Sequence, residues 1–258
     1  MEAAQQTAAR ELGVLCRGPA TWGWRGRSVG RRTRDGRWLR VACAPPGRTG
    51  PTEGVRTAAA LLPPRVPRPR LYATCEWSAD GQVYAGELTS YVEAPAISSG
   101  RIDLLSDPGL SDDWWRRLGQ ALRALASAES RRIMAGRGEL AVLRGRGIEP
   151  PVAVRWVTGH GDLHWANLTR APLTFLDWES WGLVPVGYDA GTLHALSLPV
   201  PEVAARVRRE FAADLDSPAG RTGELLALTR LLTAASAGAH ADLASLAARR
   251  LSALTGGG

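Results

Sequence analysis

Eight consecutive residues concentrate the groups that could do chemistry, and they read His-Gly-Asp-Leu-His-Trp-Ala-Asn from His160 to Asn167. Phosphoryl transfer to a hydroxyl needs a carboxylate that orients and deprotonates the acceptor, and oxygen ligands that hold Mg²⁺ against the phosphates. A carboxylate at Asp162 and an amide at Asn167 allow one loop to serve both needs. A second carboxylate, Asp177, follows the apolar stretch 173–176, which we expect to be a strand, and would bridge Mg²⁺ to the phosphates.

The two histidines of this loop also suggest a zinc site, because three residues separate His160 from His164. Such a pair lies on one face only if the segment is helical, and a zinc site needs at least one further ligand. Gly161 and Asp162 disfavour a helix here, and no third ligand is evident in the sequence. Phosphoryl transfer is therefore the favoured interpretation.

The combined pattern resembles the aminoglycoside phosphotransferase and choline kinase family, in which His-Gly-Asp-Leu-His-x-x-Asn precedes an apolar strand that ends in Asp-Trp-Glu. The resemblance implies a protein-kinase-like fold. It also implies that Asp162 is the catalytic base and that Asn167 and Asp177 are Mg²⁺ ligands. His160 would brace the loop, and Asp189, in Gly-Tyr-Asp, would open the next helix as a structural cap.

The resemblance further implies that the first part of the chain binds the nucleotide phosphates. The family usually places a lysine on its third strand, and the alternation Trp-Leu-Arg-Val puts Arg40 there, as in the choline-kinase-like branch. Arginine differs from lysine because its planar guanidinium group needs more room than the compact ammonium group of lysine. We expect Glu53, at the start of the following helix, to be the acidic partner of Arg40.

Two further stretches are expected to contact the nucleotide. Residues 26–30, with Ser28 at their centre, lie where the family's phosphate-covering turn would fall. The stretch from Glu87 to Val92, which includes Tyr91, is expected to be the extended connector whose backbone meets the adenine edge.

The elements that must position these residues change character along the chain. Turns at Asp35-Gly36 and Asp80-Gly81 and alternating residues predict strands in the first hundred residues, whereas later apolar residues recur at helical spacing. The predicted strands cover 38–43, 71–74 and 82–92, and the predicted helices cover 51–62, the segment from 111, the segment from 201, and the regions around 225–232 and 243–251. In 152–177, two short apolar strands are expected to flank the polar loop.

We therefore predict an α+β, two-lobe, protein-kinase-like fold. Residues 1–95 would form a small, mostly β, nucleotide-binding lobe. Residues 96–258 would form a larger, mostly helical lobe that carries the catalytic loop and the acceptor site.

Charge is unevenly distributed over the 258 residues, whose formal net charge is +7 and whose basic residues are all arginine. Residues 1–159 contain 24 Arg and 15 acidic residues, whereas residues 160–258 contain 8 Arg and 10 acidic residues. A basic first part suits a polyphosphate ligand, and a mildly acidic second part is compatible with a polar or cationic acceptor. The arginines are scattered rather than interleaved with aromatic residues, so no nucleic-acid partner is expected.

Cysteine usage and hydropathy indicate a cytoplasmic protein. Cys16, Cys43 and Cys75 are odd in number and lack paired or metal-ligand spacing, which is typical of a reduced compartment. No apolar stretch approaches the length of a membrane span, so no membrane partner is expected.

The sequence thus predicts an ATP- or GTP-dependent phosphotransferase that uses Mg²⁺ and a small hydroxylated acceptor. An aminoglycoside-like antibiotic, a metabolite and a hydroxyl of a biosynthetic peptide all remain open as acceptors. The alternative is a weak or inactive pseudokinase that acts in nucleotide sensing, scaffolding or peptide biosynthesis, since Arg40 replaces the usual lysine. A nucleic-acid-binding protein would instead show salt-dependent affinity and no need for Asp162. The sequence does not indicate an oligomeric state.

Overall fold

The computed structural model describes residues 1–45 and 52–256, which form two compact units. The first unit comprises Met1–Leu62, Pro67–Pro95 and Thr174–Glu179, and the second comprises Pro63–Val66, Ala96–Leu173 and Ser180–Gly258. Asp177 therefore belongs to the first unit, although it follows the loop of Asp162 in the sequence. Asp162 and Asn167 belong to the second unit.

A five-stranded antiparallel sheet forms the centre of the first unit, with strand order β1-β2-β3-β5-β4. Both predicted turns are confirmed: β2 and β3 meet at Asp35-Gly36, and β4 and β5 meet at Asp80-Gly81. Asp80 and Gly81 both have positive φ (50° and 68°), as a two-residue hairpin turn of the primed type requires. The strands are β1 (Cys16–Trp22), β2 (Ser28–Thr33), β3 (Arg37–Ala44), β4 (Leu71–Ala79) and β5 (Gln82–Ser90).

One face of this sheet is apolar and is covered by helix α1 (Glu2–Glu11). Leu39 and Val41 of β3 are fully buried on that face together with Val29 and Leu88, which confirms the alternation predicted for β3. The sequence did not predict α1. Its residues are mostly polar or Ala, and it is held mainly by contact with the sheet.

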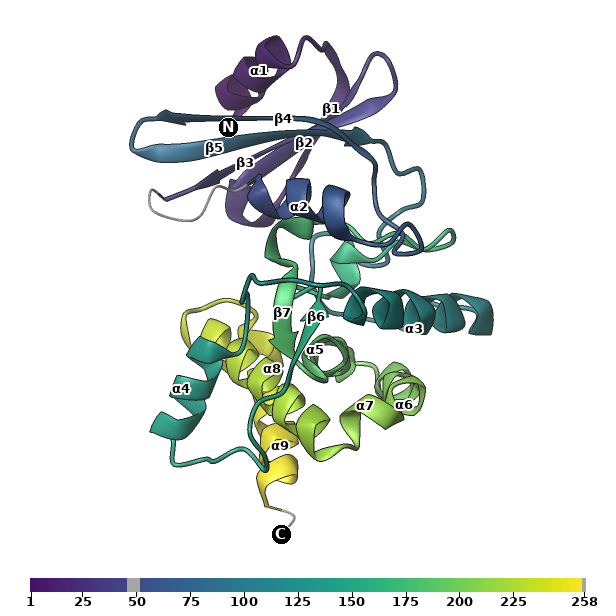
Figure 1. Ribbon diagram of the computed structural model, residues 1–258, viewed down its shortest axis with the longest axis vertical. Coiled ribbons are helices and arrows are strands. Elements are labelled where there is room, and N and C mark those ends of the chain that lie inside the picture. The colour runs from purple at the N-terminus through teal and green to yellow at the C-terminus, as the bar shows by residue number, and fades with distance from the viewer. Residues whose placement is uncertain (46–51, 257–258) are drawn as a thin grey trace. The chain divides into compact units, whose positions relative to one another are not determined.

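Helix α2 (Glu53–Leu61) lies on the face of the sheet opposite α1 (Figure 1). It buries Val55 and Ala58, and it confirms the helix predicted over 51–62, of which Pro51 lies outside the described residues. The two helices leave Arg40 of β3 on the α2 face, because its neighbours Leu39 and Val41 point toward α1.

The second unit is mostly helical, and the helices predicted from periodicity are confirmed. Ser111 caps α3 through its side chain, which accepts a hydrogen bond from the backbone N–H of Trp114. The helices are α3 (Asp112–Ala126), α4 (Arg137–Gly145), α5 (Tyr188–Ser197), α6 (Pro201–Glu210), α7 (Ala212–Leu215), α8 (Pro218–Ser236) and α9 (Ala244–Thr255).

Strands β6 (Trp156–Gly159) and β7 (Gly182–Pro185) pair with each other antiparallel. Strand β6 precedes the polar loop, and β7 follows it. The first strand predicted in 152–177 is confirmed, but the prediction of a second strand over 173–176 is wrong. These residues are extended without a strand ladder, and Phe175 donates its backbone N–H to Pro67 at 2.9 Å. The strand that pairs with β6 comes later, after Asp177.

Within the described residues, no helix is both long enough and apolar enough to cross a bilayer.

Candidate functional site

In the first unit, a cluster of one arginine and three acids lies on the α2 face of the sheet. We call it the Arg40 cluster, and it consists of Arg40, Glu87, Asp177 and Glu179. Arg40 and Glu87 are directly opposite each other on β3 and β5, and Arg40 Nη1 lies 3.6 Å from Glu87 Oε1. Arg40 Nη2 lies 3.1 Å from Asp177 Oδ2 and 3.8 Å from Glu179 Oε2. Three acids and one arginine give this cluster a negative balance.

Burial and mutual repulsion shape the electrostatics of the Arg40 cluster. Burial raises the pKa of Glu87 to about 7, since the repulsion of Asp177 and Glu179 adds to it and the attraction of Arg40 only partly offsets it. Burial alone would lower the pKa of Arg40, but the charges of its three acidic neighbours outweigh that effect and raise it. Arg40 is therefore a permanent cation that holds Asp177 and Glu179 together.

Asp177 has two features that distinguish it from the other acids of the cluster. Its backbone φ is 60°, in the left-handed region that few residues other than glycine adopt, although Asp tolerates it better than most. Its Oδ2 accepts from Arg40, whereas its Oδ1 is buried and has no hydrogen-bond partner among the described residues. A buried carboxylate oxygen without a partner is costly unless a ligand, water or cation completes it.

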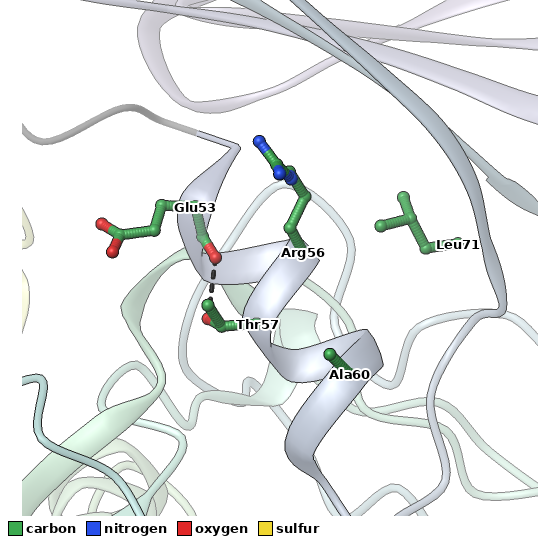
Figure 2. Close-up of a pocket in the computed structure, with 5 residues that line it drawn as sticks. All are labelled: Glu53, Arg56, Thr57, Ala60 and Leu71. Atoms are coloured by element: carbon green, nitrogen blue, oxygen red, sulfur yellow. Dashed lines mark hydrogen bonds between the residues drawn. The ribbon is translucent and has the colours of Figure 1, made fainter.

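Glu53 does not occupy the place expected for it. Within the described residues, the ion pairs of Arg40 involve Glu87, Asp177 and Glu179 and not Glu53, which corrects the predicted pairing. Glu53 instead lines a surface hollow beside α2 with Arg56, Thr57, Ala60 and Leu71. Figure 2 shows its carboxylate directed away from Arg56 and Leu71. Glu53 follows β3 closely in the sequence, but the register between β3 and β5 places Glu87 opposite Arg40.

The turn between β1 and β2 lies slightly earlier than residues 26–30, which were predicted to cover the nucleotide phosphates. The chain turns between β1 and β2 over 23–27, and Arg25 and Gly26 have positive φ (51° and 70°). Ser28 is the first residue of β2, and its carbonyl accepts from the backbone N–H of Gly23 at 2.9 Å. Gly30 lies within β2 rather than in the turn. A Cβ at Gly30 would meet the Trp38 ring at 2.2 Å.

The stretch from Glu87 to Val92, predicted to meet the adenine edge, is only partly a free segment, because β5 extends to Ser90. Residues 87–90 belong to β5, which is paired on both sides by β3 and β4, so their backbone groups serve the sheet. The side chain of Glu87 belongs to the Arg40 cluster, and a nucleotide contact of Glu87 stays a prediction. Tyr91 follows the strand and packs against Trp38, with ring centroids 5.7 Å apart. A nucleotide contact of Tyr91 stays a prediction.

In the second unit, the loop from His160 to Asn167 is fastened by Asp189 in the first turn of α5. The Asp189 carboxylate accepts from the backbone N–H of His160 at 2.6 Å and from that of Gly161 at 3.0 Å. Burial raises the pKa of Asp189 despite these bonds and the nearby His160. Gly161 has φ of 77°, and a Cβ there would meet the carbonyl oxygen of Ser180 at 2.2 Å, so this turn requires glycine.

Asp162 lies between a histidine and an arginine. Its Oδ2 is 3.6 Å from His164 Nε2, and its Oδ1 is 3.4 Å from Arg230 Nη2 on α8. Burial by itself raises the pKa of Asp162, but His164, Arg230 and His160 together lower it to about 2. About a third of the side chain (35%) remains exposed. Asp162 is therefore an ionised carboxylate that a ligand can reach.

Asn167 closes the loop by donating its Nδ2 to the backbone carbonyl of Asp162 at 3.0 Å. The side chain is nearly buried, and its Oδ1 remains the acceptor atom of the amide. The structure thus brings Asn167 and Asp162 together on one short loop, as their spacing predicted.

Sequence reasoning missed the contributions of Glu179 and Arg230, and it read Asp189 only as a helix cap. Glu179 follows Asp177 by two positions, which was a usable signal once Asp177 was singled out. Arg230 is 68 positions from Asp162 in a helix that reads as apolar, so nothing in the sequence indicated that the two side chains meet.

Oxygen atoms of the described side chains could serve the Mg²⁺ that the resemblance implies. No three His, Cys, Asp or Glu side chains of the described chain form a ready-made metal site. Proteins usually bind Mg²⁺ through one or two carboxylates together with substrate phosphates and water. The unpartnered Oδ1 of Asp177 is a suitable ligand atom, and the amide oxygen of Asn167 is another.

The solved structures that resemble this chain over nearly its whole length include antibiotic phosphotransferases. A thermostable mutant of aminoglycoside phosphotransferase APH(4)-Ia, in ternary complex with AMP-PNP and hygromycin B, matches with a TM-score of 0.65 at 13% identity, covering 99% of this chain and 98% of that chain. Macrolide 2'-phosphotransferase MphH from Brachybacterium faecium matches with a TM-score of 0.55 at 18% identity, covering 98% of both chains. Spectinomycin phosphotransferase APH(9)-Ia, with ADP and spectinomycin, matches with a TM-score of 0.60 at 11% identity, covering 93% of this chain and 88% of that chain.

These likenesses show that the chain has the two-lobe, protein-kinase-like fold of the phosphotransferases, as the loop motif predicted. No protein-family model and no curated protein matches the sequence. At such low identities the comparison shows the fold alone, and function has to be argued from the site.

Proposed function

We propose that the protein is a phosphotransferase that moves the terminal phosphate of ATP or GTP to a hydroxyl group of a small molecule. The observation that carries the proposal is Asp162, an ionised and partly exposed carboxylate on a loop that Asp189 and Asn167 fasten from both sides. Solved neighbours of the same fold hold AMP-PNP, ADP or GDP together with a hydroxylated antibiotic, which supports the same use here.

Asp162 orients the acceptor hydroxyl and takes its proton as transfer proceeds. The hydroxyl oxygen forms a new bond to the terminal phosphorus while the bridging P–O bond breaks and the nucleoside diphosphate leaves. With a pKa of about 2, Asp162 is a weak base. Its main contribution is therefore orientation, and the proton leaves the hydroxyl late in the reaction.

Arg40 supplies the fixed positive charge of the nucleotide side. Its raised pKa keeps it charged at any working pH, and its acidic neighbours on β5 and beside Asp177 hold the guanidinium in place. We propose that Asp177 and Asn167 are the Mg²⁺ ligands, and that bound Mg²⁺ neutralises phosphate charge. Ser28 and Tyr91 are proposed to contact the nucleotide through the β1–β2 turn and the segment after β5. Glu53 has no assigned role beyond lining its hollow.

The direct test is a Mg²⁺-dependent nucleotide turnover assay on wild type and Asp162→Asn, followed by an acceptor screen with product detection by mass spectrometry. We expect Asp162→Asn and Asp162→Ala to lose turnover by about 100-fold or more while keeping the circular dichroism spectrum and Tm of wild type. Full activity in either variant would overturn the assignment.

A second candidate is a pseudokinase that binds nucleotide without transferring phosphate, and one observation favours it. Arg40 Nη2 already contacts Asp177 at 3.1 Å, so the cation and a proposed metal ligand neutralise each other. Tight nucleotide binding that is insensitive to Mg²⁺, with no turnover against a broad panel of hydroxylated acceptors, would support this candidate over the enzyme.

A further inference from the structure

Arg230 is a cation beside the proposed catalytic carboxylate in the second unit, and its hydrogen bonds are long. It lies 3.4 Å from Asp162 Oδ1, 3.3 Å from the carbonyl oxygen of Gly161 and 3.4 Å from the hydroxyl of Tyr188. Charge-assisted hydrogen bonds of arginine are normally about 2.7–2.9 Å long. All three contacts are therefore weak.

Two other arginines of the same unit form short, bidentate hydrogen bonds to carboxylates. Arg250 holds Glu224 with two bonds of 2.8 and 3.0 Å, and Arg101 holds Asp103 with two bonds of 2.9 and 2.8 Å. Arg230 has no such bidentate partner among the described residues, and its side chain is 43% exposed. A planar fork with five donors, exposed beside Asp162, can receive an anion.

Apart from Asp162, which would face the acceptor hydroxyl, two carboxylates near this arginine and its loop accept hydrogen bonds from backbone N–H groups. Glu139 of α4 accepts from the backbone N–H of Gly136 at 2.8 Å, and Asp189 accepts from the loop.

The neighbouring segments are not acidic either. Residues 128–150, which include α4, contain five Arg and three Glu, and residues 231–239, which cover the end of α8 and the three residues after it, contain no charged residue. Helix α4 packs directly against α8. In these segments a polycationic acceptor would therefore meet more positive than negative side chains, and these would add to the repulsion from Arg230.

We infer that Arg230 is a specificity-determining residue that selects an acceptor with an anionic group, a carboxylate or a phosphate, close to the reacting hydroxyl. This inference rests on the proposed function, because it describes the acceptor side of the same reaction. The anion binds the guanidinium of Arg230 and the hydroxyl faces Asp162. Polycationic aminoglycosides are disfavoured.

Direct binding tests the inference without requiring turnover. Isothermal titration calorimetry would be carried out in the presence of ADP and Mg²⁺ with matched probes: gluconate, glucose 6-phosphate, glucose and glucosamine, with kanamycin as the polycation. We expect an anionic probe to bind at least about tenfold more tightly than glucose, since a hydrogen bond to a charged group typically contributes that much. A preference for gluconate indicates a carboxylate acceptor, and a preference for glucose 6-phosphate indicates a phosphate.

Variants separate Arg230 from general charge effects. Arg230→Gln should weaken the preferred anion about tenfold or more and leave glucose binding within twofold, while Arg230→Glu should reverse the preference toward glucosamine and kanamycin. Arg249→Gln, which removes an exposed arginine of α9, should bind all probes as wild type does.

Equal binding of glucose and both anions by wild type would overturn the inference, as would tight kanamycin binding or unchanged anion affinity in a folded Arg230→Gln. The proposed function is judged separately by the nucleotide turnover of Asp162→Asn. A protein that binds the anion through Arg230 but turns over no nucleotide would contradict the function and not the anion site. A protein that phosphorylates glucosamine or kanamycin better than the anionic probes would contradict only the inference.

Discussion

Arg40 Nη2 donates to Asp177 Oδ2 at 3.1 Å, although 137 positions separate the two residues in the sequence, and the other oxygen of that carboxylate is buried without a partner among the described residues. The two oxygens of Asp177 thus differ in role. One fixes the side chain against a permanent cation, and the other remains available as a ligand atom.

Substitution of Asp177 by Asn should abolish the Mg²⁺ dependence of the protein more than it affects the fold. We expect turnover to fall by about 100-fold or more, because the amide keeps the shape but loses the charge that attracts a divalent cation. The measurement is turnover and nucleotide affinity across a Mg²⁺ titration.

Glu179→Gln is the matched control for Asp177, since it removes a negative charge from the same cluster. Glu179 Oε2 is farther from Arg40, at 3.8 Å, and its side chain is 41% exposed. We expect less than a tenfold effect on turnover. Equal losses in the two variants would mean that the net charge of the cluster matters and that the ligand atom of Asp177 does not.

The raised pKa of Glu87 predicts that the free energy of unfolding depends on pH. Its pKa is raised from 4.5 to about 7, so between these values the folded protein keeps a proton that the unfolded chain has lost. The free energy of unfolding should therefore fall as the pH rises from about 4.5 to 7 and change little from this source above 7. The contribution is at most about 3 kcal/mol.

Urea unfolding at pH 5 and pH 8 measures this dependence. Wild type should lose more stability between the two values than Glu87→Gln, which cannot ionise at this position. Other groups titrate in both proteins and cancel in the comparison. An identical change in the two proteins would contradict the raised pKa of Glu87.

We expect Asp189 to hold the catalytic loop in place and not to take part in the reaction. Asp189→Ala leaves the backbone N–H groups of His160 and Gly161 buried without their acceptor, which should destabilise the protein by about 3 kcal/mol and lower turnover. Asp189→Asn retains one acceptor oxygen and should lie between the alanine variant and wild type. The checks are urea unfolding and hydrogen exchange at the two amides, and full protection of both in Asp189→Ala would show that another group holds the loop.

Local sequence patterns were sufficient wherever the interacting residues are close along the chain. The spacing of Asp162 and Asn167 places both on one loop, and the Asn167 amide does bond to the Asp162 carbonyl. Alternation in β3 and helical spacing in α3 predicted the buried faces correctly, because side-chain direction repeats with the period of each element. The loop motif was also sufficient to predict the kinase-like fold.

Tertiary structure alone decided which charges meet. Sequence order suggested Glu53 as the partner of Arg40, whereas the register between β3 and β5 places Glu87 opposite it and a segment far along the chain adds Asp177 and Glu179. Helix packing brings Arg230 to Asp162 in the same way. A local pattern fixes which face of an element a side chain occupies, but register and packing fix what lies across from it, and those depend on the burial of the whole unit.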